Sequence, residues 1–193
     1  GVQIIEEANK TIIYGFGLNS LKKPPKEIYL GNSGTSARLL AGLLASQNFT
    51  SEITGDPSLS SRPMKRISEP LKLMNANIQT TNGSLPLKII GSKLLNNEIE
   101  IKIPSAQIKS GLLFAALNTK GETIIVENSI TRNHTEIMLE FFGSNIKINK
   151  INKKKIIKII GKKELISKNI QVPSDLSSSA FFIVAALINS DSK

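Results

Sequence analysis

A chain of 193 residues is long enough to bury a substantial core, and its 40% hydrophobic and 21% charged residues are ordinary for a globular protein. The absence of Cys excludes disulfides, a thiolate nucleophile and Cys-based metal sites, and a single His134 excludes a cluster of His ligands. The 25 basic and 15 acidic residues give a net charge of +10, which suits a partner with several negative charges, either nucleic acid or a phosphorylated metabolite.

Other features narrow the class of partner. Only 5% of residues are aromatic, so stacking platforms for single-stranded nucleic acid are scarce, and lysine runs such as 152–155 are typical of solvated turns. No apolar run is long enough to span a bilayer, and no secretion signal opens the sequence. We therefore expect a cytoplasmic protein that binds neither nucleic acid nor membrane and holds no structural metal.

Hydrophobic periodicity predicts an α/β (α+β) fold built from a repeated βαβαββ unit. The first complete unit is expected to hold a strand at 27–30, a helix at 35–46, a strand at 50–54, a helix opened by Pro63, and strands at 77–80 and 85–90 joined by an Asn82-Gly83 turn. The second unit is expected to hold a strand at 98–103, a helix at 106–117, a strand at 123–126, a helix at 134–142, and strands at 145–148 and 155–160.

The ends of the chain are interpreted as parts of neighbouring units. Strands at 2–5 and 11–14 would close an earlier unit, and a strand at 170–172 with a helix at 177–188 would begin a third. The expected domain division is therefore 1–168, covering the end of one unit and two complete units, and 169–193, crossing into a second, truncated domain. Both ends favour a fragment of a longer protein.

Identical residues at corresponding positions of successive units support the repeat. Pro104-Ser105 and Pro173-Ser174 lie at corresponding strand-to-helix junctions, and Arg62 and Arg132 each lie between a strand and a helix. Because equivalent junctions gather at one end of such a domain, we expect these loops to converge into an anion site at helix N-termini.

The loop 31–38 is the strongest local signal for anion binding. Small residues and two hydroxyls follow a short apolar strand and precede an apolar helix, which leaves backbone N–H groups open to a phosphate or carboxylate. A helix start capped by Asn32 or Ser33 explains the same residues without a ligand. Arg38 is expected to brace the loop from within the helix.

Five motifs occur in order along the chain: Leu30-Gly-Asn-Ser-Gly-Thr35, Gly55-Asp-Pro-Ser-Leu-Ser-Ser-Arg62-Pro-Met64, Pro104-Ser-Ala-Gln107-Ile-Lys-Ser110, Thr131-Arg132-Asn-His-Thr-Glu136 and Val172-Pro-Ser-Asp175. In these motifs the chain resembles the 5-enolpyruvylshikimate-3-phosphate synthase (3-phosphoshikimate 1-carboxyvinyltransferase) family, in its bacterial class II branch, as an internal fragment. Asn133 and Ser174 depart from the family pattern, where Asp and Gly are common.

The resemblance implies one domain of the two-domain enolpyruvyltransferase fold, an inside-out α/β barrel, in an enzyme that is monomeric when full length. It implies transfer of the enolpyruvyl group of phosphoenolpyruvate to the 5-hydroxyl of shikimate 3-phosphate, with release of phosphate, in the shikimate pathway of aromatic amino-acid biosynthesis. No cofactor or metal is implied.

The resemblance also implies roles for individual residues. Phosphoenolpyruvate would be bound by Asn32, Gly34, Thr35, Arg62 and Gln107. Shikimate 3-phosphate would be bound by Ser105, Ala106, Gln107 and Arg132. Gly34 is the position where the family associates Gly with glyphosate sensitivity and Ala with tolerance. The catalytic acid and base are expected outside this chain, so the chain alone is expected to be inactive, and Lys109 receives no role.

Two alternatives remain open from the residues. One is an enzyme of the same fold that resembles UDP-N-acetylglucosamine 1-carboxyvinyltransferase, although that enzyme usually carries a reactive Cys. The other is a non-catalytic basic module that binds anions or RNA, which would show steeply salt-dependent nucleic-acid affinity.

Overall fold

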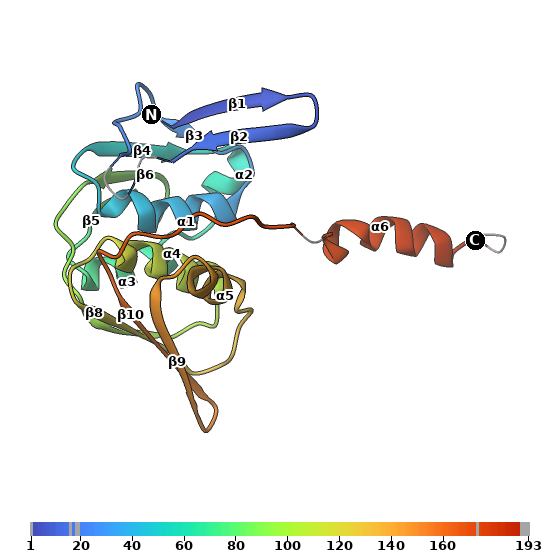
Figure 1. The fold of residues 1–193 in the computed structure, drawn as a ribbon. Coiled ribbons are helices and arrows are strands. Elements are labelled where there is room, and N and C mark those ends of the chain that lie inside the picture. The colour runs from blue at the N-terminus through green and yellow to red at the C-terminus, as the bar shows by residue number, and fades with distance from the viewer. Residues whose placement is uncertain (1, 16, 18–19, 173, 190–193) are drawn as a thin grey trace.

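Two four-stranded sheets lie on either side of a layer of helices (Figure 1). A computed structural model describes residues 2–15, 17, 20–172 and 174–189. The first sheet has the order β3-β4-β6-β5, and the second has the order β7-β8-β10-β9. The two sheets therefore share one topology, which confirms the predicted repeat.

The first unit runs from residue 28 to residue 90. Its β3 and β4 are parallel, whereas β4 and β5 both pair antiparallel with β6. Its elements are β3 (Ile28–Tyr29), α1 (Gly34–Ala45), β4 (Thr50–Thr54), α2 (Pro57–Ser60), α3 (Lys65–Leu73), β5 (Asn77–Thr81) and β6 (Ser84–Ile90). The predicted Asn82-Gly83 turn joins β5 to β6, with both residues at positive φ, as a tight hairpin turn requires.

The second unit repeats this order from residue 98 to residue 160. Its β7 and β8 are parallel, and β8 and β9 both pair antiparallel with β10. Its elements are β7 (Glu98–Ile101), α4 (Ala106–Leu117), β8 (Glu122–Glu127), α5 (His134–Phe141), β9 (Asn145–Ile151) and β10 (Lys154–Ile160).

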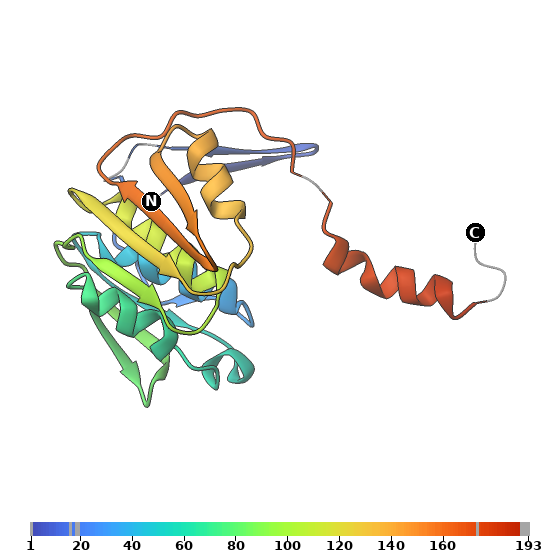
Figure 2. The ribbon, with the colours of Figure 1, turned by 90° about the horizontal axis from the view of Figure 1, so that it is seen from below.

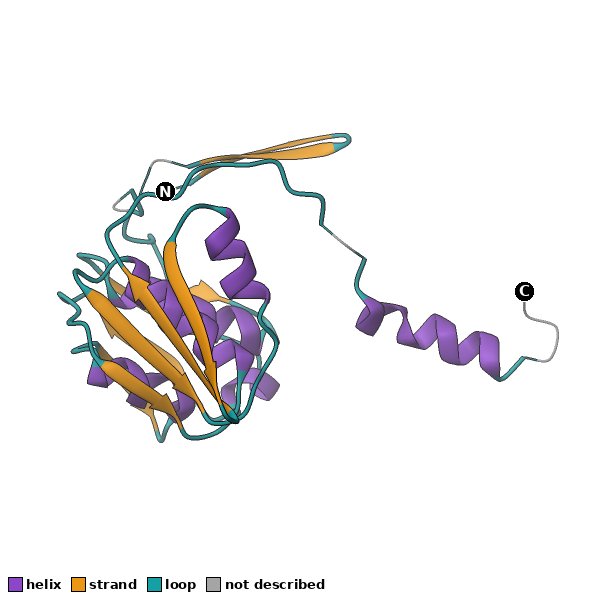
Figure 3. Ribbon diagram, turned by 60° about the horizontal axis from the view of Figure 1, so that its bottom comes forward, coloured by secondary structure: helices purple, strands orange, loops and turns teal. Residues whose placement is uncertain are grey.

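Both sheets bury one face and expose the other. In β6, Leu85, Leu87 and Ile89 are buried and alternate with less buried residues, and in β10 Ile157 and Ile159 are fully buried. Period-2 burial is what a sheet with one solvated face produces. The helices lie on the buried faces, as Figure 3 shows for the β7–β10 sheet. This arrangement, with helices inside and sheets outside, confirms the predicted inside-out fold.

The helices α1 and α4 are parallel neighbours at the centre of the molecule. Arg38 hydrogen bonds to Gln107 near their N-termini, and Asn118 donates to Ser46 beyond their C-termini. Between these points the backbones touch, because a Cβ added to Gly42 would lie 1.8 Å from the carbonyl oxygen of Gly111. Only glycine at position 42 permits this separation.

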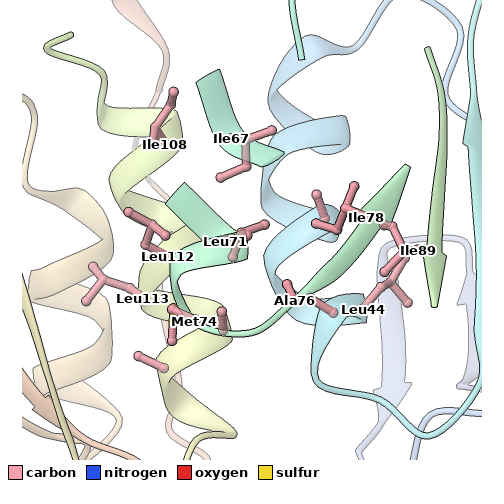
Figure 4. Packing of buried hydrophobic residues seen from close by; sticks show 14 of the residues in the cluster. Leu44, Ile67, Leu71, Met74, Ala76, Ile78, Ile89, Ile108, Leu112 and Leu113 are labelled. Atoms are coloured by element: carbon pink, nitrogen blue, oxygen red, sulfur yellow. The ribbon is translucent and has the colours of Figure 1, made fainter. Parts of the chain in front are cut away.

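The helix α3 completes the core. Ile67 and Leu71 on one face of it and Met74 directly after it are fully buried, as their spacing predicted. Figure 4 shows these side chains together with Leu112 and Leu113 of α4, and α3 packs against both α1 and α4. The helix begins at Lys65, two residues after the predicted Pro63, and the short helix α2 before it was not predicted.

Two peripheral elements lie apart from this core. The hairpin of β1 (Gln3–Glu7) and β2 (Lys10–Tyr14) and the helix α6 (Leu176–Leu187) project from the two-sheet body in both views (Figures 1 and 2). In α6, Phe181 is 82% and Phe182 79% exposed.

The predicted strand at 170–172 is wrong, because these residues form no strand. A strand needs a hydrogen-bonded neighbour, and among the described residues no strand pairs with this segment. The predicted Pro173-Ser174 junction includes Pro173, which lies outside the described residues. No helix within the described ranges is long and apolar enough to cross a bilayer.

Replacing Gly42 with Ala is expected to lower the free energy of unfolding by roughly 2–3 kcal/mol, because the added methyl group forces α1 and α4 apart. Urea denaturation of the purified chain measures this. Gly15→Ala is the matched control, since a Cβ there has nothing within 4 Å. Equal midpoints for the two variants would contradict the close packing described above.

Candidate functional site

The N-termini of α1 and α4 lie at the same end of the molecule, each capped by a serine. Ser33 accepts from the amide of Ser36 at 3.2 Å, and Ser105 accepts from the amide of Ile108 at 3.4 Å. Of the two possible caps of α1, the structure therefore uses Ser33. Because the helices are parallel, the positive ends of both dipoles meet here, which favours an anion.

A chain of hydrogen bonds crosses between these helix starts. Arg38 Nη1 donates to Gln107 Oε1 at 2.7 Å, and Gln107 Nε2 donates to Thr35 Oγ1 at 2.7 Å. The guanidinium can only donate, so it fixes which end of the Gln107 carboxamide is the acceptor. Arg38 Nη1 also donates to the Gly34 carbonyl at 3.2 Å, which confirms that Arg38 braces the loop from within α1.

Gly34 lies between two guanidinium groups. A Cβ added at Gly34 would lie 2.9 Å from Arg38 Nη1 and 3.1 Å from Arg62 Nη1. On the other side of the loop, Arg62 Nη2 donates to Asn32 Oδ1. The missing side chain at Gly34 therefore lets Arg62 approach the start of α1.

The short helix α2 positions Arg62. Asp56 caps this helix by accepting from the amide of Leu59 at 2.7 Å, and the Leu59 side chain is fully buried. The amide of Arg62 donates to the Leu59 carbonyl at 3.0 Å. The apolar anchor at Leu59 thus holds the backbone from which Arg62 projects.

The site concentrates positive charge. Burial lowers the pKa of Arg38, and the nearby charges of Arg62 and Arg66 lower it further. An arginine side chain still stays protonated in proteins at neutral pH. A bound anion would reduce the repulsion between these guanidinium groups, so the arrangement is suited to a phosphate or carboxylate ligand.

A second cluster, the buried Lys–Glu network, lies under the loop that carries Arg132. It consists of Lys109, Lys155, Glu127 and Glu136, all at most 2% exposed. Lys109 Nζ lies 2.8 Å from Glu136 Oε1 and 3.0 Å from Glu127 Oε2, and Lys155 pairs with Glu136. Sequence reasoning missed this network, although a lysine within the mostly apolar helix α4 was a signal for it.

The structure joins most of the predicted site residues directly. The five residues predicted for phosphoenolpyruvate, Asn32, Gly34, Thr35, Arg62 and Gln107, are linked through the contacts above. Ser105 and Ala106 lie at the same helix start as Gln107. Arg132 is exposed and its loop is tied to α4 by Lys109, but within the described part of the chain no contact joins its side chain to the others.

Among the described residues no group of three or more His, Asp or Glu side chains could hold a metal ion. His134 is the first residue of α5 and is exposed.

Comparisons with known proteins identify the family of the chain. The family model of EPSP synthase (3-phosphoshikimate 1-carboxyvinyltransferase) matches residues 1–192. The chain belongs to the EPSP synthase family. Its relatives include the 3-phosphoshikimate 1-carboxyvinyltransferases of Ruthia magnifica, 53% identical over 97% of the chain, and of Streptococcus gordonii, 46% identical over 100% of it.

Solved structures support the family fold. An EPSP synthase structure from Acinetobacter baumannii superposes with a TM-score of 0.85 at 48% identity over 96% of this chain, and the chain covers 42% of that protein. The chain likewise spans 42% of the Ruthia magnifica relative and 45% of the Streptococcus gordonii relative. It therefore corresponds to less than half of a family member, with the two-domain enolpyruvyltransferase fold as its parent architecture.

The buried Lys–Glu network predicts an acid-sensitive stability. Burial by itself raises the pKa of Glu136, but hydrogen bonds from Lys109 and Lys155 outweigh it, so the pKa lies below its usual value. The stabilisation is complete above the unfolded-state pKa of about 4.3 and is lost as pH falls through the lower folded-state pKa.

We expect Glu136→Gln to lower the free energy of unfolding at pH 7, and the difference from the parent chain to shrink below about pH 4. Urea denaturation at a series of pH values measures this. Glu98→Gln, at the exposed start of β7, is the control and should follow the parent curve. A pH-independent difference for Glu136→Gln would contradict a lowered pKa.

Proposed function

We propose that this chain is the phosphoenolpyruvate- and shikimate 3-phosphate-binding part of a 3-phosphoshikimate 1-carboxyvinyltransferase. The whole enzyme would transfer the enolpyruvyl group of phosphoenolpyruvate to the 5-hydroxyl of shikimate 3-phosphate and release phosphate, in the shikimate pathway. The position of Gly34 between Arg38 and Arg62, at two parallel helix N-termini, is the observation that carries the proposal.

The two substrates would be divided between the two loops of the site. Arg62 would hold phosphoenolpyruvate, with Asn32, Gly34 and Thr35 lining its pocket and Gln107 donating its second Nε2 hydrogen. The segment Ser105–Gln107 and Arg132 would hold shikimate 3-phosphate. Ser105 can do this while capping α4, since a hydroxyl that accepts from an amide still has a hydrogen to donate.

The chain's contribution to catalysis would be positioning and electrostatic stabilisation. Addition to the enolpyruvyl carbon and elimination of phosphate need proton transfer by groups within hydrogen-bond reach. The nearby carboxylates of this chain have other tasks, since Asp56 caps α2 and Glu127 and Glu136 are paired with lysines. The acid and base would therefore come from the rest of the enzyme, and orientation and charge stabilisation from this part.

The same proposal covers the organisation of the whole protein. Residues 1–168 would form most of one domain, and residues 169–193 would lead into the other. The rest of the whole enzyme would then supply partners for the projecting β1–β2 hairpin and for α6. The enzyme would be monomeric and cytoplasmic. The proposed second domain is supported by the match to bacterial relatives more than twice as long as this chain.

The test is Arg62→Ala in a full-length enzyme that carries these 193 residues. The KM for phosphoenolpyruvate should rise roughly tenfold to a hundredfold, since a hydrogen bond to a charged group contributes about 1.5–3 kcal/mol. The rate of phosphate release, measured while the concentration of each substrate is varied, gives this KM. Lys147→Ala, which removes an exposed cation from β9, is the control and should match the parent.

The acceptor substrate separates this function from its alternatives. Phosphate release should require shikimate 3-phosphate and should not occur with UDP-N-acetylglucosamine. Release only with the UDP sugar would identify the sibling activity instead. Salt-sensitive RNA binding without any release would point to the non-catalytic module.

Gly34→Ala in the same enzyme tests the pocket itself. The new methyl group would displace the guanidiniums of Arg38 and Arg62, so it should weaken inhibition by glyphosate and raise the KM for phosphoenolpyruvate, with a smaller effect on the KM for shikimate 3-phosphate. Steady-state inhibition kinetics measure all three quantities. Unchanged glyphosate inhibition would mean that Gly34 does not line the pocket.

A further inference from the structure

We propose that Lys109 is a positioning residue that holds the Arg132 loop in place for substrate binding. The Arg132 loop is the segment between β8 and α5, residues 128–133. This inference rests on the proposed function, in which Arg132 binds shikimate 3-phosphate.

Lys109 contacts the loop and the elements on both sides of it. Its Nζ donates to the Arg132 carbonyl at 2.8 Å and to Thr131 Oγ1 at 2.9 Å. The same nitrogen pairs with Glu127, the last residue of β8, and with Glu136, in the first turn of α5. One ammonium group thus fixes where the loop leaves the sheet, where it enters the helix, and the backbone of Arg132 itself.

The charges around Lys109 are balanced and enclosed. Two lysines face two glutamates, and the Lys109 side chain is completely buried. A buried ammonium is stable only where its hydrogens are accepted, and here two carboxylates, a hydroxyl and a carbonyl surround them. These partners fix one position of the loop backbone.

The orientation of the Arg132 backbone leaves its side chain free to bind ligand. The Arg132 carbonyl is turned inward to Lys109, and Arg132 as a whole is exposed. Within the described ranges its guanidinium has no hydrogen-bond or ion-pair partner. Lys109 lies on α4 one turn after the cap Ser105 and two residues after Gln107, so a single helix sets both parts of the proposed shikimate 3-phosphate site.

A second contact ties the same elements together. Ser110 Oγ and Thr135 Oγ1 lie 2.7 Å apart and join α4 to the first turn of α5. This bond fixes α5 but does not reach the loop, so loss of Lys109 should release the loop more than the helix.

The test is Lys109→Met in the full-length enzyme, since Met keeps an unbranched apolar stem and removes the donor. The KM for shikimate 3-phosphate should rise roughly tenfold, in line with the cost of misplacing a binding group, with kcat and the KM for phosphoenolpyruvate within about twofold of the parent. Lys154→Met is the control. It removes an exposed lysine 3.9 Å from Glu100 and should change none of these values.

A charge-balanced variant separates positioning from stability. Lys109→Met alone leaves an excess buried carboxylate, whereas Lys109→Met with Glu127→Gln leaves Lys155 paired with Glu136. The double variant should regain the urea midpoint of the parent but keep the raised KM for shikimate 3-phosphate. Recovery of that KM together with stability would overturn the proposal, because Lys109 would then matter only for folding.

Limited trypsin digestion tests the loop without any activity. Cleavage between Arg132 and Asn133 should be faster in the double variant than in the parent, while cleavage after Lys153, in the turn between β9 and β10, should be unchanged. Equal rates at Arg132 would refute the anchoring. An enzyme that shows this difference but releases no phosphate with shikimate 3-phosphate would leave the anchor standing and the proposed function wrong.

Discussion

The close contact between α1 and α4 is the constraint on which the site depends. Gly42 faces the backbone of Gly111, so the two helices run side by side and in the same direction. Residues from two repeat units, about 70 positions apart, are thereby brought within hydrogen-bond distance. One of the bonds formed at this contact joins Arg38 to Gln107, and it sets the orientation of the amide proposed to meet substrate.

Much of this architecture could be predicted from local signals. The helix Ala106–Leu117 was predicted with the same bounds because Pro104-Ser105 marks a capped start and an apolar run follows. The Asn82-Gly83 turn and the strands beside it were equally clear. The short helix α2 was missed, although Asp56-Pro57 is itself a typical helix start.

Other features depend on tertiary contacts and could not be predicted locally. Residues 170–172 have the composition of a strand but pair with no strand in the part of the chain that the structure describes, so the prediction there was wrong. The partners of Lys109 come from β8, the loop after it and α5, and no spacing rule links them. The motifs predicted which residues gather around Gly34, whereas the proximity of the Arg62 and Arg38 guanidiniums emerged only from the fold.

The two repeat units fasten their equivalent arginine loops by different physical means. The Arg62 loop, residues 55–62, is anchored mainly by the buried Leu59 side chain, whose burial does not depend on pH, and Asp56, which caps α2, is its one titratable anchor among the contacts described above. The Arg132 loop is anchored by buried carboxylates and ammonium groups, whose attraction disappears when the carboxylates are protonated. Acidification therefore removes the lysine–glutamate pairs that hold the Arg132 loop but leaves Leu59 buried beneath Arg62. Under the proposed function, the hold on shikimate 3-phosphate would weaken at a higher pH than the hold on phosphoenolpyruvate.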